Sequence, residues 1–138
     1  MKVLLDTSIL LDVLLARDPW VRESSAIWQA CDEGRLSGYI SGVSPSNIFY
    51  IVRKIAGFDR AIECVKTCLE AFDILPLNQD VLREAAALAG KDYEDNIHIV
   101  SARTGDMERI ITRDATGFAL SPTRVVTPQE LLLELAPK

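Results

Sequence analysis

Short apolar runs alternate with helix-forming patterns along the whole of this 138-residue chain. A run rich in valine and leucine, such as residues 3–5, is typical of a buried strand. Strands that are separated by helices pair in parallel through right-handed crossovers, and helices then cover both faces of the sheet. We therefore predict an α/β fold with three layers, α/β/α, around a central, mainly parallel sheet. The expected strands are residues 2–6, 38–41, 73–75, 109–112 and 124–126, and the expected helices are residues 7–15, 19–31, 48–56, 60–71, 81–89, 93–104 and 131–135.

Several of these helices have recognisable start signals. Ser44 is the expected N-cap of the middle helix, with Pro45 at its first helical position. Asn78 or Asp80 is expected to open the helix that follows the third strand. The segment 127–130, Thr-Pro-Gln-Glu, has the pattern of a capping box and predicts the start of the last helix.

The composition is that of one soluble globular domain. The hydrophobic fraction of 49% and the charged fraction of 25% are ordinary for such a domain, and no linker interrupts the chain, so we expect a single domain over residues 1–138. No apolar run is long enough to span a bilayer, and the first expected strand begins directly after Met1, where a signal peptide would stand. Three cysteines without a framework spacing fit a reducing compartment. A cytoplasmic location is therefore expected.

The net charge of −5 is unevenly distributed. Residues 1–69 hold eight basic and eight acidic side chains, whereas residues 70–138 hold seven basic and twelve acidic ones. An acidic balance disfavours long-range attraction to nucleic acid, because phosphate-binding proteins usually have a basic patch. Part of the excess lies in the segment 92–95, Asp-Tyr-Glu-Asp, and closely spaced carboxylates are also typical of a cation site.

Acidic residues follow two of the expected strands. Asp6 ends the first strand and Asp114 follows the fourth, while Asp95 lies in the first turn of the expected helix 93–104. Ligands of open parallel sheets bind beyond the carboxyl ends of the strands, so these three carboxylates are candidates for one hard-cation site that holds Mg²⁺ or Mn²⁺. The structural alternatives are a helix cap for Asp6, a first-turn charge for Asp95 and a turn residue for Asp114.

These residues, taken in order, resemble the PIN-domain family of metal-dependent ribonucleases, which includes the VapC-like toxins of toxin–antitoxin pairs. The resemblance rests on the segments 3–12, 41–53, 92–102 and 110–118, and so covers nearly the whole chain. It implies a five-stranded parallel sheet and cleavage of RNA phosphodiester bonds with Mg²⁺ or Mn²⁺ held by four acids. It also implies a small antitoxin protein as partner and a homodimer.

Carried over by position, the first, third and fourth family acids fall on Asp6, Asp95 and Asp114. Asn47 occupies the place of the second acid, usually a glutamate, and an amide supplies no charge. Gly117 stands where many relatives have a further acid. The resemblance therefore implies a catalytic group of Asp6, Asp95, Asp114 and Asn47, with the three aspartates as metal ligands. A site weakened by Asn47 is the alternative.

Further residues have possible supporting roles. The hydroxyls of Ser8 and Thr112 can hold the neighbouring carboxylates or serve as local caps, and Asp92 is an additional ligand or, as we favour, a helix N-cap. The basic residues Arg53, Lys54 and Arg113 are the expected contacts to substrate phosphates. Asp12 lies six residues beyond Asp6 and is expected to be a solvated surface charge.

Other classes of function remain open at this point. A PIN-like module that binds RNA or protein without turnover agrees with Asn47 and with the acidic net charge. A phospho-acceptor receiver domain also places acids at strand ends, although the chain lacks the lysine after a late strand that such a domain needs. A zinc site built from Cys64, Cys68 and His98 is a third alternative, opposed by the usual role of helical cysteines in core packing.

Overall fold

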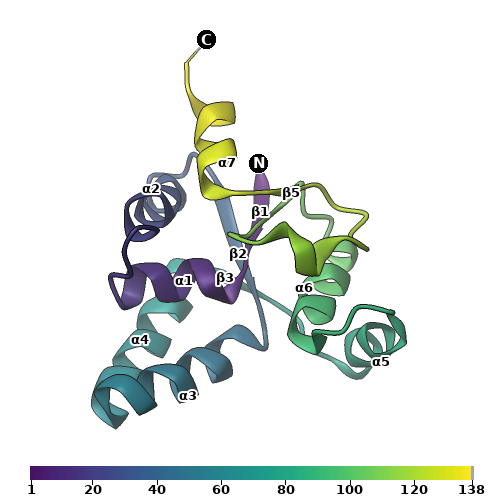
Figure 1. The fold of residues 1–138 in the computed structure, drawn as a ribbon, viewed down its shortest axis with the longest axis horizontal. Coiled ribbons are helices and arrows are strands. Elements are labelled where there is room, and N and C mark those ends of the chain that lie inside the picture. The colour runs from purple at the N-terminus through teal and green to yellow at the C-terminus, as the bar shows by residue number, and fades with distance from the viewer. Residues whose placement is uncertain (138) are drawn as a thin grey trace.

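The computed structural model describes residues 1–137 and contains one five-stranded parallel sheet. The strand order is β3-β2-β1-β4-β5, so the strand that ends at Asp6 lies in the centre of the sheet (Figure 1). The strands are β1 (Lys2–Leu5), β2 (Ser37–Ser41), β3 (Asp73–Leu75), β4 (Arg109–Ile111) and β5 (Val125–Val126). The predicted α/β fold with a parallel five-stranded sheet is therefore confirmed.

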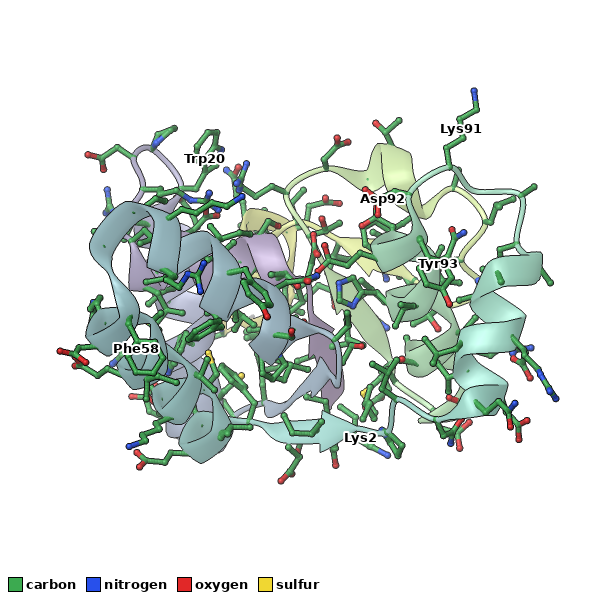
Figure 2. All side chains as sticks on the ribbon, turned by 90° about the horizontal axis from the view of Figure 1, so that it is seen from below. Lys2, Trp20, Phe58, Lys91, Asp92 and Tyr93 are labelled. Atoms are coloured by element: carbon green, nitrogen blue, oxygen red, sulfur yellow. The ribbon has the colours of Figure 1, made fainter. Side chains whose placement is uncertain are left out.

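Helices cover both faces of this sheet, with α1–α4 on one side and α5 and α6 on the other (Figure 1). Figure 2 shows Phe58, at the start of α4, and Tyr93, at the start of α6, on opposite sides of the molecule. The helices are α1 (Thr7–Leu14), α2 (Val21–Asp32), α3 (Ser44–Ala56), α4 (Phe58–Ala71), α5 (Gln79–Ala87), α6 (Tyr93–Thr104) and α7 (Pro128–Leu135), and a short 3-10 helix, η1 (Ala115–Phe118), follows β4.

The central strand β1 is buried on both faces, as expected for a parallel sheet between helices. Successive side chains of a strand point to opposite faces, so Val3 and Leu5 enter the core beneath α1–α4 and α7, while Leu4 packs with α6. β1 also pairs with β2 on one side and with β4 on the other. Asp6 therefore follows directly after a strand that is buried on both faces and paired on both sides.

Most helix boundaries agree with the sequence prediction to within two residues, but α3 begins four residues and α7 three residues before the predicted starts. The helix α3 begins at Ser44 with Val43 as N-cap, so the prediction of Ser44 as the cap was wrong; its hydroxyl instead bonds to Thr7. The helix η1 was not predicted, because four residues are too few for a periodic pattern. The predicted caps Asn78, Asp92 and Thr127 each accept a backbone N–H, and the capping box of α7 is complete.

No helix within residues 1–137 combines the length and the apolar character that crossing a membrane requires.

Candidate active site

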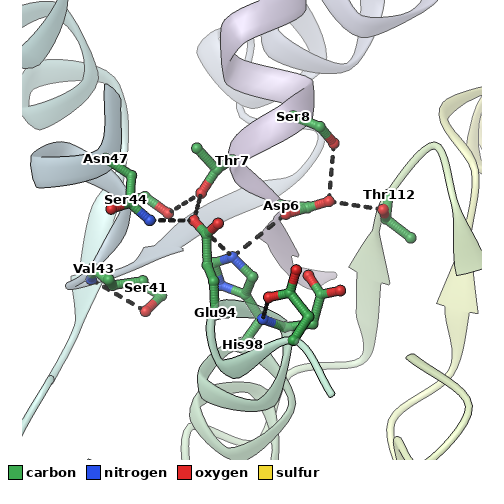
Figure 3. A network of polar contacts seen from close by, with 12 residues as sticks. Asp6, Thr7, Ser8, Ser41, Val43, Ser44, Asn47, Glu94, His98 and Thr112 are labelled. Atoms are coloured by element: carbon green, nitrogen blue, oxygen red, sulfur yellow. Dashed lines mark hydrogen bonds and ion pairs between the residues drawn. The ribbon is translucent and has the colours of Figure 1, made fainter. Parts of the chain in front are cut away.

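Asp6 lies directly beyond β1, at the carboxyl edge of the sheet, and is largely buried. Asp6 occupies the N-cap position of α1, as the structural alternative expects, but its carboxylate makes no cap hydrogen bond. Oδ2 of Asp6 instead accepts hydrogen bonds from Ser8 Oγ at 2.9 Å and from Thr112 Oγ1 at 2.8 Å (Figure 3). Two hydroxyls from different elements thus fix the orientation of a carboxylate that has no capping role.

His98 lies beside Asp6 and is fully buried on α6. Its Nε2 lies 3.4 Å from Oδ1 of Asp6 and 3.7 Å from Oε2 of Glu94, and neither contact has full hydrogen-bond geometry. Burial lowers the pKa of His98, but the contacts with the two carboxylates outweigh burial and raise this pKa to about 9. At neutral pH the imidazole is therefore a buried cation that faces two carboxylates.

The same contacts act on the pKa of Asp6. Burial raises the pKa of its carboxyl, but the neighbouring His98 and the hydroxyls of Thr112 and Ser8 outweigh burial and hold it below the usual value. Asp6 is therefore ionised at neutral pH and presents a fixed negative charge at the sheet edge.

Glu94 brings a further carboxylate to this edge, and the sequence analysis did not select it. Its Oε2 accepts hydrogen bonds from Thr7 Oγ1 and from Asn47 Nδ2, each at 2.7 Å (Figure 3). Burial raises the pKa of Glu94, whereas His98, Thr7 and Asn47 lower it, and the net pKa is below the usual value. The sequence signal that could have identified Glu94 is its spacing from His98, because residues four apart lie on the same face of a helix.

Asp95 has the opposite electrostatic situation. Burial and the negative charges of Asp6, Asp92 and Glu94 raise the pKa of Asp95 to about 7, although His98 acts to lower it. Asp92 caps α6 by accepting the Asp95 N–H at 3.0 Å, which is the role we favoured for it. An excess of carboxylates that keeps one of them partly protonated is the electrostatic state that a bound cation would relieve.

Gly117 leaves the space that the carboxylate of Asp95 occupies. A Cβ atom at position 117 would collide with Oδ2 of Asp95. Glycine at position 117 therefore allows Asp95 to approach η1.

Asp114 is exposed and lies at the N-terminus of η1, two residues beyond Thr112. Its Oδ1 accepts the backbone N–H of Thr116 at 2.9 Å, and hydrogen bonding from the side chain and the backbone of Thr116 holds the pKa of Asp114 below the usual value. The negative charge of Asp6 acts in the opposite direction and raises this pKa, but less strongly.

Mg²⁺ and Mn²⁺ match the donors at this edge, because carboxylate oxygens are the ligands that these ions prefer. Within residues 1–137, however, no three His, Cys, Asp or Glu side chains are gathered closely enough to hold an ion as they stand. The ligand set of Asp6, Asp95 and Asp114 therefore stays a prediction. The structure shows several carboxylates beside one buried imidazole at this edge of the sheet.

The prediction that Asp12 is a solvated surface charge was wrong, because its side chain is fully buried. Its carboxylate accepts hydrogen bonds from Arg17 Nε at 3.0 Å and from Arg113 Nε at 2.7 Å. The guanidinium of Arg113 also lies 3.9 Å from the ring centroid of Trp20. Arg113 is thus held in place beside the sheet edge by a carboxylate and an aromatic ring.

The other two candidate phosphate contacts, Arg53 and Lys54, are exposed in the last turn of α3. Arg53 lies over the rings of Phe49 and Tyr50, at 6.0 and 5.8 Å from their centroids. A role of these residues toward phosphate stays a prediction.

Two alternative functions do not agree with the structure. Cys64 and Cys68 are buried in the core between α4 and the sheet, and they form no metal-binding group with His98 in the described part of the chain. The sheet order also differs from that of a receiver domain, in which the first strand lies between the second and third strands. Here β1 lies between β2 and β4.

Comparisons with known proteins agree with this fold. The chain is similar to a toxin–antitoxin complex from Klebsiella pneumoniae, at 28% identity and a TM-score of 0.66, with 91% of this chain and 97% of that chain covered. It is also similar to Mycobacterium tuberculosis VapC20, described as a Sarcin-Ricin loop cleaving toxin, at 12% identity and a TM-score of 0.70, with 86% and 94% covered. DNA-bound VapBC from Salmonella typhimurium gives 17% identity and a TM-score of 0.69, with 93% and 98% covered.

At 12% and 17% identity, the likeness to the last two structures shows the fold alone. No curated protein matches the sequence. The model of the PIN-domain family matches residues 2–116, which is most of the chain. The chain therefore belongs to the PIN-domain family.

Proposed function

We propose that this protein is a Mg²⁺- or Mn²⁺-dependent endoribonuclease and the toxin of a toxin–antitoxin pair. The observation that carries the proposal is the pair of carboxylates at the carboxyl edge of the sheet, those of Asp6 and Glu94, which lie 3.4 and 3.7 Å from the same ring nitrogen of His98. Membership of the PIN-domain family supports nuclease chemistry at this edge.

Asp6, Asp95 and Asp114 are the residues that would hold the ion. When bound, Mg²⁺ or Mn²⁺ supplies a Lewis acid for the phosphoryl oxygen and for the attacking water. Ser8 and Thr112 keep the carboxylate of Asp6 in one orientation through their hydrogen bonds to Oδ2. Arg113, fixed by Asp12 and Trp20, is the basic side chain next to Asp114 and is suited to contact a substrate phosphate.

The toxin role is supported by what the similar structures contain. The Klebsiella pneumoniae structure is described as a toxin–antitoxin complex, and VapC20 is described as a toxin that cleaves the Sarcin-Ricin loop. For the present chain we propose an RNA substrate, a small antitoxin that covers the acidic edge, a homodimer and a cytoplasmic location.

A binding module without turnover is the second candidate function. It is favoured by one observation, namely that Asn47 offers an amide where the resemblance implies a glutamate.

Removal of divalent metal separates the two functions. We expect the purified chain to cleave a labelled single-stranded RNA with added Mg²⁺ or Mn²⁺, to stop in excess EDTA, and to resume when Mn²⁺ is restored, because the carboxylates alone cannot activate water or stabilise charge on the phosphate. Gel analysis of the products measures this. RNA binding without cleavage at any metal concentration would favour the binding module, and cleavage that persists in EDTA would contradict the metal-dependent mechanism.

A further inference from the structure

Asn47 makes a specific contact from the position where the resemblance implies an acid. Its Nδ2 donates to Oε2 of Glu94 at 2.7 Å, so the amide on α3 holds a carboxylate that comes from α6. The contact joins residues that lie 47 positions apart in the sequence. A carboxylate is therefore present beside position 47, although residue 47 itself carries no charge.

Thr7 holds the same oxygen from a third element. Its Oγ1 donates to Oε2 of Glu94 at 2.7 Å and lies 2.9 Å from Oγ of Ser44. Because the single hydroxyl proton of Thr7 goes to Glu94, Ser44 is the donor in the second bond. Residues from α1 and α3 thus fix Glu94 together, as Figure 3 shows.

His98 gives independent evidence that Glu94 and Asp6 face one point. Its side chain is fully buried, and neither ring nitrogen has a hydrogen-bond partner within residues 1–137. Nε2 nevertheless lies within 3.4 Å of Asp6 and 3.7 Å of Glu94. A buried imidazole within ion-pair distance of two carboxylates places those carboxylates in one electrostatic site.

We propose that Glu94 is the fourth acid of the cation site, in the place of the carboxylate that the family resemblance implies at position 47, and that Asn47 and Thr7 are its positioning residues. The inference rests on the proposed function for its part in RNA cleavage, but its part in cation binding is tested separately. On this account, Asn47 does not indicate a weakened site.

The physical reason for an amide at position 47 follows from the same contact. A glutamate in place of Asn47 would set two carboxylates against each other, whereas the amide donates a hydrogen bond to an ionised acceptor. Asparagine at 47 and glutamate at 94 are therefore complementary, and the charge can be moved across the contact by exchanging the two residues.

The exchange is the experiment. Glu94→Gln removes the charge and keeps the shape of the side chain, and the double variant Asn47→Glu with Glu94→Gln returns a carboxylate to the site from α3. Glu70→Gln, which removes an exposed charge from α4, is the matched control. Binding of Mn²⁺ alone is measured by isothermal titration calorimetry, RNA cleavage by gel assay and folding by thermal denaturation.

We expect Glu94→Gln to weaken Mn²⁺ binding by about tenfold or more and to slow cleavage, with Glu70→Gln unchanged, and we expect the double variant to recover most of both losses. Glu94→Gln that is folded and binds Mn²⁺ as the parent does would overturn the inference. So would a folded double variant with no recovery, because the charge would then be needed at Glu94 for another reason.

The two proposals fail in distinguishable ways. If the parent binds Mn²⁺ through Glu94 but cleaves no RNA, the proposed ribonuclease activity is wrong and the inference about the cation site is still supported. If the parent cleaves RNA with Mn²⁺ and Glu94→Gln changes neither Mn²⁺ binding nor the cleavage rate, the proposed ribonuclease activity is supported and Glu94 is not part of its site.

Discussion

We expect Asp6→Asn to slow the proposed metal-dependent RNA cleavage by about 1,000-fold, because a carboxylate ligand contributes several kcal/mol through the cation and each 1.4 kcal/mol is a factor of ten. Asparagine has nearly the same shape as aspartate but no charge. Single-turnover cleavage of a labelled RNA at saturating Mn²⁺ measures the loss.

Asp73→Asn is the control for this variant. Asp73 is exposed and begins β3, so it lies at the amino ends of the strands, whereas Asp6 lies at their carboxyl ends. The control variant is expected to cleave at the parent rate. Asp6→Asn also removes one of the two charges that face His98, so thermal denaturation must accompany the assay. A folded Asp6→Asn protein with more than about a tenth of the parent activity would be inconsistent with an essential ligand role.

Asp12→Ala is expected to lower the free energy of unfolding by about 3 kcal/mol, because removing one partner of a buried ion pair leaves the others uncompensated. Asp12 accepts hydrogen bonds from Arg17, Arg113 and Ser24, and so connects α1 with α2 and with the segment after β4. The side chains of Arg17 and Arg113 are 33% and 24% exposed, so the expected loss of unfolding free energy is at the lower end of the range for buried pairs. Urea denaturation measures the change.

Asp32→Ala provides the comparison for Asp12→Ala. Asp32 is exposed at the end of α2, so its loss is expected to change the free energy of unfolding by no more than about 0.5 kcal/mol. If Asp12→Ala were as stable as Asp32→Ala, the account of Asp12 as a buried structural charge would be incorrect.

The architecture could be predicted from the sequence because the strands of the sheet are marked by short apolar runs. Each strand of this parallel sheet is short and apolar, and each is followed by a helical pattern, so strand positions and parallel pairing follow from periodicity and crossover rules. The positions of Asp6 and Asp114 followed from the same reasoning, since Asp6 comes directly after β1 and Asp114 lies three residues beyond the end of the neighbouring strand β4. Their placement at one edge needed no knowledge of side-chain contacts.

Asp12 shows where this reasoning stops. The helix-face argument compared Asp12 only with Asp6, which precedes the same helix, and the two carboxylates do have different hydrogen-bond partners. It contained no information about Ser24 on α2 or Arg113 after β4, which meet Asp12 only in the folded protein. The burial of a charged residue depends on such partners, and sequence periodicity does not report them.

Glu94 was missed, and His98 was considered only as a zinc ligand, for a similar reason. Their spacing places them on one face of α6, but their importance comes from Asp6, Thr7 and Asn47, which belong to other elements. The sequence analysis treated position 47 as a single site that either has or lacks an acid. In the structure, the charge comes from one helix and the hydrogen bond that holds it comes from another.

The central claim is that the carboxylates at the sheet edge bind a divalent ion. An anomalous difference map from crystals soaked in Mn²⁺ tests this most directly. The account predicts a peak at the carboxyl edge of the sheet, in contact with the carboxylates of Asp6, Asp95 and Asp114. A map at saturating Mn²⁺ with no peak at this edge, or with its peaks only elsewhere on the protein, would contradict it.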